Sequence, residues 1–176
     1  MRSVTGTLVQ LHHLVAALLF LISASAQATD SVEPTPDFAV TQIQLTPSGS
    51  VTPIGFKVRL ALTPFQHSYG LMFSPPLTTK SGMLFVFKDL KPRTFWMKNT
   101  PIALDMLFFD ENGRLIALIS NATPHSLTMR RSMVAAKYVL EIGGREADRL
   151  NLKIGSRLHL PIVIPENSPQ SRRKVK

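Results

Sequence analysis

The sequence contains no cysteine, and this absence excludes several kinds of chemistry. No disulfide can stabilise the fold, so an ordinary hydrophobic core must do so. Thiolate metal sites, thiol nucleophiles, redox exchange and lipid attachment through an N-terminal cysteine are excluded as well. Aromatic residues make up only 7% of the chain. Because no ladder of alternating aromatic and basic residues occurs, we expect no nucleic-acid partner.

Acidic residues are also scarce, with 11 Asp and Glu against 20 Lys and Arg and a formal net charge of +9. For an exported protein, this charge favours anionic envelope components as partners, such as phospholipid head groups or lipopolysaccharide phosphates. The alternative is that the charge serves only solubility. Residues 172–176 are Arg-Arg-Lys-Val-Lys and follow a polar, proline-containing stretch. We therefore predict a disordered basic tail over residues 165–176.

Long hydrophobic runs are missing except at the N-terminus. Residues 14–22 are uninterruptedly apolar, follow a positive charge at Arg2 and precede the small-x-small pattern Ala26-Gln27-Ala28. This run is about half of the ~20 residues that a membrane span needs. Residues 1–28 are therefore predicted to be a signal peptide, cleaved near Ala28, with the mature protein in the periplasm or outside the cell. An uncleaved anchor is the alternative. No later segment is apolar over a sufficient length to span a membrane, so stable membrane insertion is not expected after cleavage of the signal peptide.

The remaining chain has the length of one domain. Residues 29–37 are acidic and proline-containing and are interpreted as a linker, and residues 38–164 as a single β-rich domain. Strict alternation over residues 54–62 predicts a half-buried strand. Further strands are expected at 40–45, 83–87, 93–98, 104–109, 114–119, 138–142 and 158–164.

Two short helices and several turns complete this prediction. Thr63-Pro64 is typical of a helix start, and the helix would end at Gly70. A second helix is expected at 145–151, a hairpin turn at Asn112-Gly113 and a long loop over 120–132. The expected fold class is mainly β, a single compact antiparallel barrel- or sandwich-like domain with about two short helices.

A polar group of residues within an apolar stretch marks the best candidate site. Between two apolar runs lie Lys98, Asn99, Thr100 and Asp105, and polar groups in such surroundings need partners. One interpretation is a structural clasp, in which Asp105 accepts hydrogen bonds from Lys98 or from residues 99–100. The other is the polar edge of a pocket for an anionic or amphipathic small molecule, with Trp96 and Lys98 on one face of a strand. The candidate ligand-binding residues are Trp96, Lys98, Asn99 and Asp105.

An enzymatic alternative would use Asp105 and His125 as the acid and base of a hydrolase. The sequence has no nucleophile elbow, no Ser-x-x-Lys and no phosphate-binding glycine motif. A non-enzymatic, exported binding domain is therefore favoured, and no cofactor is predicted.

Soft-metal binding is a further alternative. Met72, Met83, Met97 and Trp96 lie within 25 residues of one another, and thioethers select copper(I). The competing interpretation is that these methionines fill gaps in the core. The histidines have no metal-ligand spacing, so no metal site is predicted.

Three motifs occur in order along the chain: Gly70-Leu71-Met72-Phe73, Gly82-Met83-Leu84-Phe85-Val86-Phe87, and Phe95-Trp96-Met97-Lys98-Asn99-Thr100 with Leu104-Asp105. Together they resemble the bacterial and archaeal family called domain of unknown function 192, over roughly residues 39–162. Members usually carry an arginine after the first motif, where this chain has Ser74-Pro75-Pro76. The resemblance implies a small, β-rich, often exported domain, and it implies no activity.

Overall fold

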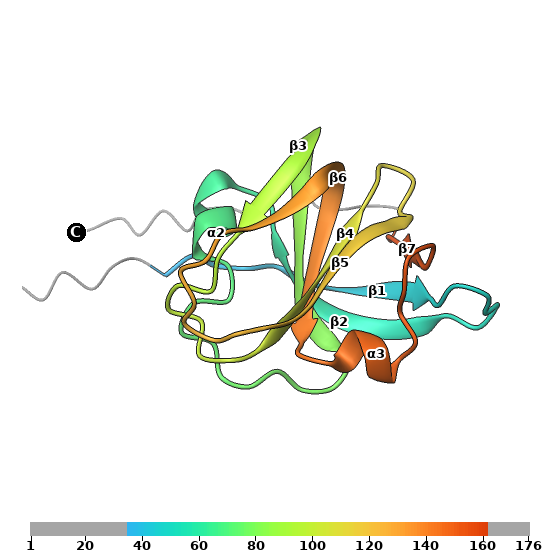
Figure 1. The fold of residues 1–176 in the computed structure, drawn as a ribbon, viewed down its shortest axis with the longest axis horizontal. Helices are drawn as coiled ribbons and strands as arrows, with labels where there is room; N and C mark the ends of the chain where they lie inside the picture. The colour runs from blue at the N-terminus through green and yellow to red at the C-terminus, as the bar shows by residue number, and fades with distance from the viewer. Residues whose placement is uncertain (1–34, 162–176) are drawn as a thin grey trace, which may run out of the picture. The chain divides into compact units, whose positions relative to one another are not determined.

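The structure, a computed structural model, describes residues 35–161 as a β-rich domain (Figure 1). The predicted signal peptide, the basic tail and residues 162–164 of the last expected strand lie outside the described residues. No helix within residues 35–161 is long and apolar enough to cross a membrane. The elements in chain order are β1 (Val40–Thr46), β2 (Ile54–Ala61), α2 (Pro64–Tyr69), β3 (Ser81–Phe95), β4 (Leu104–Phe109), β5 (Leu115–Ala122), β6 (Arg130–Gly143), α3 (Glu146–Arg149) and β7 (Arg157–His159).

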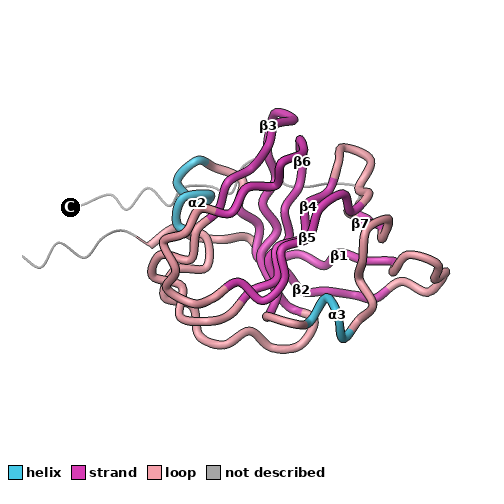
Figure 2. Tube along the Cα trace, viewed as in Figure 1, coloured by secondary structure: helices cyan, strands magenta, loops and turns pink. Residues whose placement is uncertain are grey.

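The strands form one sheet in the order β5-β4-β6-β3-β2-β1-β7. All neighbouring pairs are antiparallel except β2 and β3, which are parallel over five residue pairs because α2 and its following loop connect them. The sheet curls into a half-barrel, as Figure 2 shows. Its two edges meet at one end, where the Leu158 amide donates to the Gly113 carbonyl over 2.7 Å and the Leu115 amide to the Ser156 carbonyl over 2.8 Å. The predicted mainly β, single-domain class is confirmed.

The central strands separate two apolar clusters. All six residues of β4 are buried, so neither face of this strand is exposed to solvent. Successive side chains point to opposite faces of a strand. Leu107 and Phe109 accordingly pack with β1, β2 and Ala147 of α3. Met106 and Phe108 pack instead with Leu71 and with other residues around α2. Both faces of the sheet are therefore core, and a polar side chain on either face needs a partner.

Helix α2 begins as the sequence predicts. The Gln66 amide donates to the Thr63 hydroxyl over 3.2 Å, and the Thr63 amide donates to Gln66 Oε1 over 3.0 Å. This reciprocal pair is a capping box, with Pro64 at the start of the helix. Gln66 also donates to the Asp37 carbonyl over 2.6 Å. These bonds fix the position of α2, which places His67 and Tyr69 beside the sheet.

Two sequence predictions about strands are wrong in detail. The strands expected at 83–87 and 93–98 are one strand, β3, which ends at Phe95, and the expected loop at 120–132 is shorter because β6 begins at Arg130. Long-range pairing of β3 with β6 is the cause. That ladder is interrupted where residues 87–90 of β3 and residues 132–134 of β6 have no regular partner. We call these two interruptions together the double bulge.

Candidate functional site

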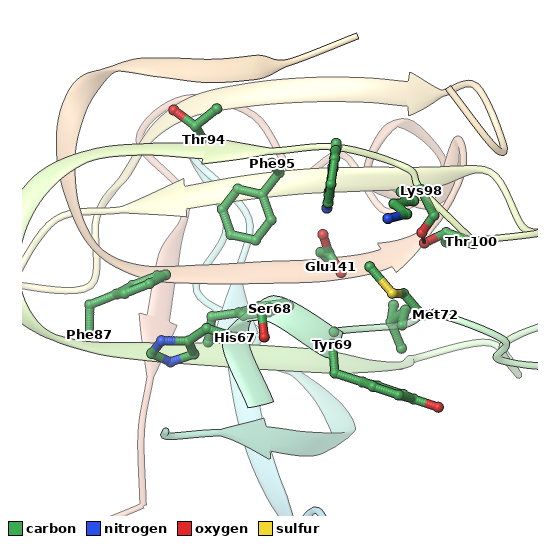
Figure 3. Close-up of a pocket in the computed structure, with 14 residues that line it drawn as sticks. His67, Ser68, Tyr69, Met72, Phe87, Thr94, Phe95, Lys98, Thr100 and Glu141 are labelled. Carbon is green, nitrogen blue, oxygen red and sulfur yellow. Dashed lines mark hydrogen bonds between the residues drawn. The ribbon is translucent and has the colours of Figure 1, made fainter. Parts of the chain in front are cut away.

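A cavity of about 190 Å³ lies between α2, the residues that follow it and the apolar face of β3 and β6 (Figure 3). The segment 94–100 closes another side. The aromatic residues in its lining are His67, Tyr69, Phe85, Phe87, Phe95 and Trp96. This arrangement brings together residues from four separate parts of the chain, and it can enclose a small molecule with an apolar body.

Glu141 is the buried ionisable residue of this cavity. Its side chain comes from β6, is only 4% exposed and has two fully buried methionines, Met83 and Met106, as cross-strand neighbours. Burial raises the pKa of Glu141 to about 8. No side chain or backbone group within residues 35–161 donates a hydrogen bond to its carboxyl group, which faces Met72, Lys98 and Thr100 across the cavity (Figure 3). The carboxyl group is therefore available to a ligand.

His67 shapes the wall of the cavity and carries no charge in it. Its Nε2 lies 3.0 Å from the Ala61 carbonyl oxygen, and its ring centroid lies 4.4 Å from that of Phe87. Burial lowers the pKa of His67, the backbone contacts to Ala61 and Val86 opposing this only in part. The imidazole is thus neutral near pH 7 and acts as a further aromatic surface.

Trp96 and Lys98 both line the cavity, and Lys98 Nζ lies 5.2 Å from the Trp96 ring centroid. The expected tryptophan platform beside a cation is present. Trp96 is 40% exposed, and no ion pair joins Lys98 to Glu141. Both residues therefore lie at the opening, whereas Glu141 lies at the buried end.

Asn99 is not part of the cavity lining. Its backbone has a positive φ of 54°, and its carbonyl accepts a hydrogen bond from the Phe73 amide over 2.8 Å. This bond ties the segment before β4 to the loop after α2. Asn99 therefore supports the opening through its backbone.

Asp105 is fully buried and does not line the cavity. The prediction that it accepts hydrogen bonds from Lys98 or from residues 99–100 is wrong. Its donors are instead the backbone amides of Asn121, Arg145 and Ala147, at 2.7, 2.9 and 2.8 Å. Sequence proximity was misleading, because these donors lie 16 to 42 residues away. The structure therefore brings Trp96 and Lys98 together and separates them from Asp105.

The residues of the hydrolase alternative are not joined by a hydrogen bond. His125 is exposed and its backbone amide donates to the Thr100 carbonyl over 3.1 Å. The three donors to Asp105 are backbone amides, and the His125 ring is not among them. An acid–base pair between these residues has no support in this geometry.

The methionines of the copper alternative are divided. Met83 and Met97 are fully buried in the apolar cluster that contains Met106 and Phe108, whereas Met72 lines the cavity. Among residues 35–161, no three His, Asp or Glu side chains gather as a metal site would require. The buried methionines fill core space, as their surroundings of Leu, Phe and Val predict.

Glu141 is a site residue that sequence reasoning missed. The segment Tyr138-Val139-Leu140-Glu141-Ile142 contains one carboxylate within an apolar strand. When the residues before and after such a carboxylate in the sequence are all apolar, the strand is typically buried on both faces of the sheet. The lone glutamate in that setting was the available signal.

Comparison with known proteins places the chain in a family. The model of DUF192, described as an uncharacterized ACR, matches residues 43–160. The chain therefore belongs to this family of unknown function, as its motifs predict. A Sinorhizobium meliloti 1021 structure, described as a candidate transcription regulator, is 33% identical with a TM-score of 0.68, covering 72% of this chain and 97% of that one. A Novosphingobium aromaticivorans protein of unknown function is 31% identical with a TM-score of 0.67, covering 74% and 91%. No curated protein matches the chain.

Proposed function

We propose that this protein binds a small amphipathic molecule that carries a protonated amine, with Glu141 as the partner of the amine. The observation that carries the proposal is a carboxyl group that is 4% exposed, faces a cavity and receives no hydrogen bond from residues 35–161. Buried polar groups in proteins are normally hydrogen-bonded. No fully buried side-chain oxygen or nitrogen within residues 35–161 lacks a partner. The Glu141 oxygens are therefore reached from the cavity, where a ligand can donate a hydrogen bond to them.

An amine is favoured over an acid by the depth of the two charged residues. Glu141 is buried and Lys98 is exposed at the opening. An ammonium group beside Glu141 would offset the cost of burying the ionised carboxylate, whereas an anionic ligand would find no charge partner there and would be repelled once Glu141 ionises. The aromatic walls add cation–π attraction for the amine and apolar contact for the rest of the ligand.

Trp96 and Lys98 would hold the outer part of the ligand. The Trp96 ring offers a flat apolar surface, and the Lys98 ammonium can meet an anionic group that stays near water. This role agrees with the amphipathic ligand that the sequence analysis predicts. Export to the periplasm or beyond, which residues 1–28 predict, would make the ligand a small molecule of the cell envelope or its surroundings.

The test compares matched libraries of small amines and small carboxylates by isothermal titration calorimetry. We expect amines to bind, and Glu141→Gln to lose at least about tenfold in affinity, because it removes a buried charge partner. Glu111→Gln, an exposed residue in the turn between β4 and β5, is the matched control and should bind as the wild type does. Equal binding by Glu141→Gln would overturn the proposal.

The pH dependence of binding separates the two ligand classes. Below pH 8 the Glu141 carboxyl group is protonated, so an amine must displace that proton and its affinity falls about tenfold for each pH unit below 8. A ligand that accepts a hydrogen bond from the protonated acid would instead lose affinity above pH 8. Affinity that falls only above pH 8 would contradict the amine assignment.

A further inference from the structure

The double bulge presents apolar side chains to water on a protruding part of the sheet. Figure 1 shows β3 and β6 extending together beyond the rest of the domain at this end. Met133 is 79% exposed and Leu90 is 44% exposed, and Val134 lies beside Met133 in the second bulge. Met133 also has a positive φ of 58°, so the backbone turns at this residue. Large apolar side chains held at such a protrusion indicate a contact surface.

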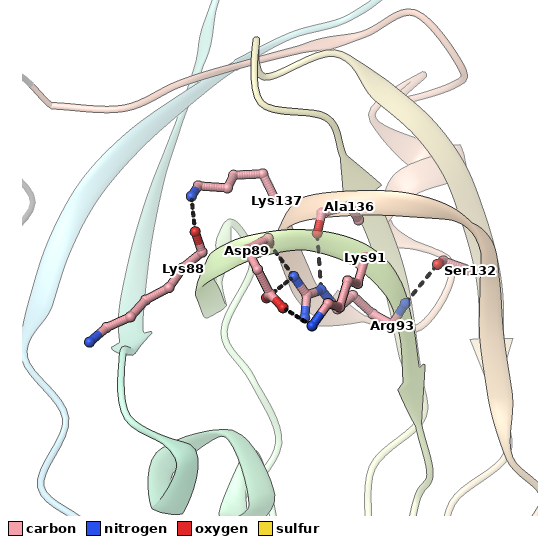
Figure 4. A network of polar contacts seen from close by, with 7 residues as sticks. All are labelled: Lys88, Asp89, Lys91, Arg93, Ser132, Ala136 and Lys137. Atoms are coloured by element: carbon pink, nitrogen blue, oxygen red, sulfur yellow. Dashed lines mark hydrogen bonds and ion pairs between the residues drawn. The ribbon is translucent and has the colours of Figure 1, made fainter.

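Arg93 holds the two bulges together (Figure 4). Its backbone amide donates to Ser132 Oγ over 2.9 Å, and its Nε donates to the Ala136 carbonyl over 3.0 Å. Its Nη2 lies 2.7 Å from Asp89 Oδ1, and its guanidinium lies 3.9 Å from the Phe87 ring centroid. The double bulge is thus held in place by several contacts. Binding a partner would therefore cost it little conformational entropy.

Basic residues surround these apolar side chains. Residues 87–93 and 130–137 contain six Lys and Arg and one acid, Asp89. Lys91 Nζ lies 2.8 Å from Asp89 Oδ2, so the single negative charge is already paired. Lys88, Lys91 and Arg131 are exposed. The protrusion is therefore a positive surface with apolar side chains at its centre.

We infer that the double bulge docks the protein on an anionic phospholipid surface. Lys88, Lys91 and Arg131 would contact the head groups, and Leu90 and Met133 would enter the boundary between head groups and acyl chains. This is peripheral binding, with no membrane span. It does not rest on the proposed amine pocket. Phe87 belongs to both the double bulge and the cavity lining, but the residues that would contact the membrane, Lys88, Leu90, Lys91, Arg131 and Met133, do not line the cavity.

A phospholipid surface fits better than duplex DNA. DNA phosphates would match the charges, yet they offer nothing to large apolar side chains on an outward bulge. The bulges carry no exposed aromatic ring for stacking on bases. A bilayer surface satisfies both features at once, because its head groups are anionic and its interior is apolar.

The test uses protein from Thr29 onward, which retains every described element and the basic tail. Binding is measured by co-sedimentation with vesicles of phosphatidylcholine alone and of phosphatidylcholine with phosphatidylglycerol. We expect binding only to the anionic vesicles. Lys88→Gln with Arg131→Gln should weaken it about tenfold or more. The control is Lys57→Gln with Lys153→Gln, two exposed lysines that lie on β2 and in the loop before β7, and it should retain much more binding.

A site-specific probe tests the apolar part. Because the chain has no cysteine, Met133→Cys gives one attachment point for an environment-sensitive fluorophore, and Val51→Cys, at a 95% exposed position in the turn after β1, gives the control. Anionic vesicles should shift the Met133→Cys emission to shorter wavelength and leave the Val51→Cys emission unchanged. Circular dichroism verifies that each variant is folded.

Three outcomes would overturn the inference. The first is equal binding by the double-bulge variant and the control variant, which would assign binding to the tail or another surface. The second is an unshifted Met133→Cys probe on vesicles that carry the protein. The third is a Met133→Cys response to duplex DNA or an acidic protein and none to vesicles.

Discussion

Asp105 and Glu141 are two buried carboxyl groups on adjacent strands with opposite surroundings. In the β4–β6 ladder, Met106 pairs with Glu141 and Asp105 pairs with Ile142, so the two acids lie on opposite faces of the sheet. Asp105 receives three backbone hydrogen bonds, and Glu141 receives none from residues 35–161. Burial alone therefore does not mark a functional acid. The absence of a protein donor is the distinguishing feature.

The bonds of Asp105 also explain what this residue is for. Two of its donors, Asn121 and Arg145, have positive φ angles of 50° and 64°. Non-glycine residues rarely adopt this conformation without compensation. Asp105 thus fixes the end of β5 and the start of α3 in place. Its role is structural, whereas Glu141 has no comparable structural partner and faces a cavity.

The largest expected effect is a pH-dependent stability component from Glu141. Its pKa is raised from 4.5 in the unfolded chain to about 8 in the fold, so the folded state retains a proton that the unfolded state releases. The free energy of unfolding should therefore fall as pH rises from 4.5 to 8, by on the order of 4 kcal/mol. Urea unfolding of wild type and Glu141→Gln over this range measures it. A constant difference between the two proteins would contradict the raised pKa.

Asp105→Ala should destabilise the protein by about 3–4 kcal/mol at pH 7, because three backbone amides lose their acceptor. Thermal and urea unfolding check this value. Asp148→Ala, an exposed acid in α3, is the control and should change stability by less than about 0.5 kcal/mol. A small effect of Asp105→Ala would contradict the distinction between a structural Asp105 and a ligand-binding Glu141, because the fold would then depend on neither acid.

Gly144→Ala tests the segment that donates to Asp105. An added Cβ would lie 2.7 Å from Asn121 Oδ1 and 2.9 Å from the Ala103 Cβ, so the backbone around the carboxylate must shift at a cost of about 1–3 kcal/mol. Gly143→Ala is the neighbouring control, since its Cβ would meet only Glu146 Oε2 at an ordinary 3.5 Å. Equal stability of the two variants in urea unfolding would show that the backbone segments that donate to Asp105 can shift at little cost in free energy.

Lys98→Ala should have the smallest effect on stability, below about 0.5 kcal/mol, because Lys98 is exposed and makes no ion pair within the described residues. Its unfolding is measured beside that of Asp105→Ala. A loss as large as that of Asp105→Ala would restore the predicted clasp between the two residues. A loss of ligand affinity with unchanged stability would support its place at the opening of the cavity.

Local features of the sequence predicted local structure well. Thr63-Pro64 identified the start of α2 because a capping box lies within four residues. The turn between β4 and β5 was predicted from Asn112-Gly113. In the structure Gly113 has a φ of 73°, and Asp110 Oδ1 accepts from the amides of Asn112 and Arg114 over 2.9 and 2.8 Å. Each of these structures is built from neighbours along the chain, so their residue types are sufficient to specify them.

The long strands could not be predicted in the same way. Residues 88–92 contain three charged residues and Pro92, which is unfavourable in a regular strand, so the sequence pattern divided β3 in two. Pairing with β6 joins the two parts across the double bulge. The decisive hydrogen bonds come from residues about 50 positions away, and no local pattern contains them.

By itself the sequence determined the β-rich class, the first helix, the turn after β4 and the proximity of Trp96 and Lys98, all of which depend on spacing over a few residues. Only the tertiary structure decided which buried acid is available. Asp105 and Glu141 both appear in the sequence as single carboxylates beside apolar residues. Whether each acid has a donor depends on which distant backbone amides the curled sheet and α3 bring to its face, and that is a property of the folded chain.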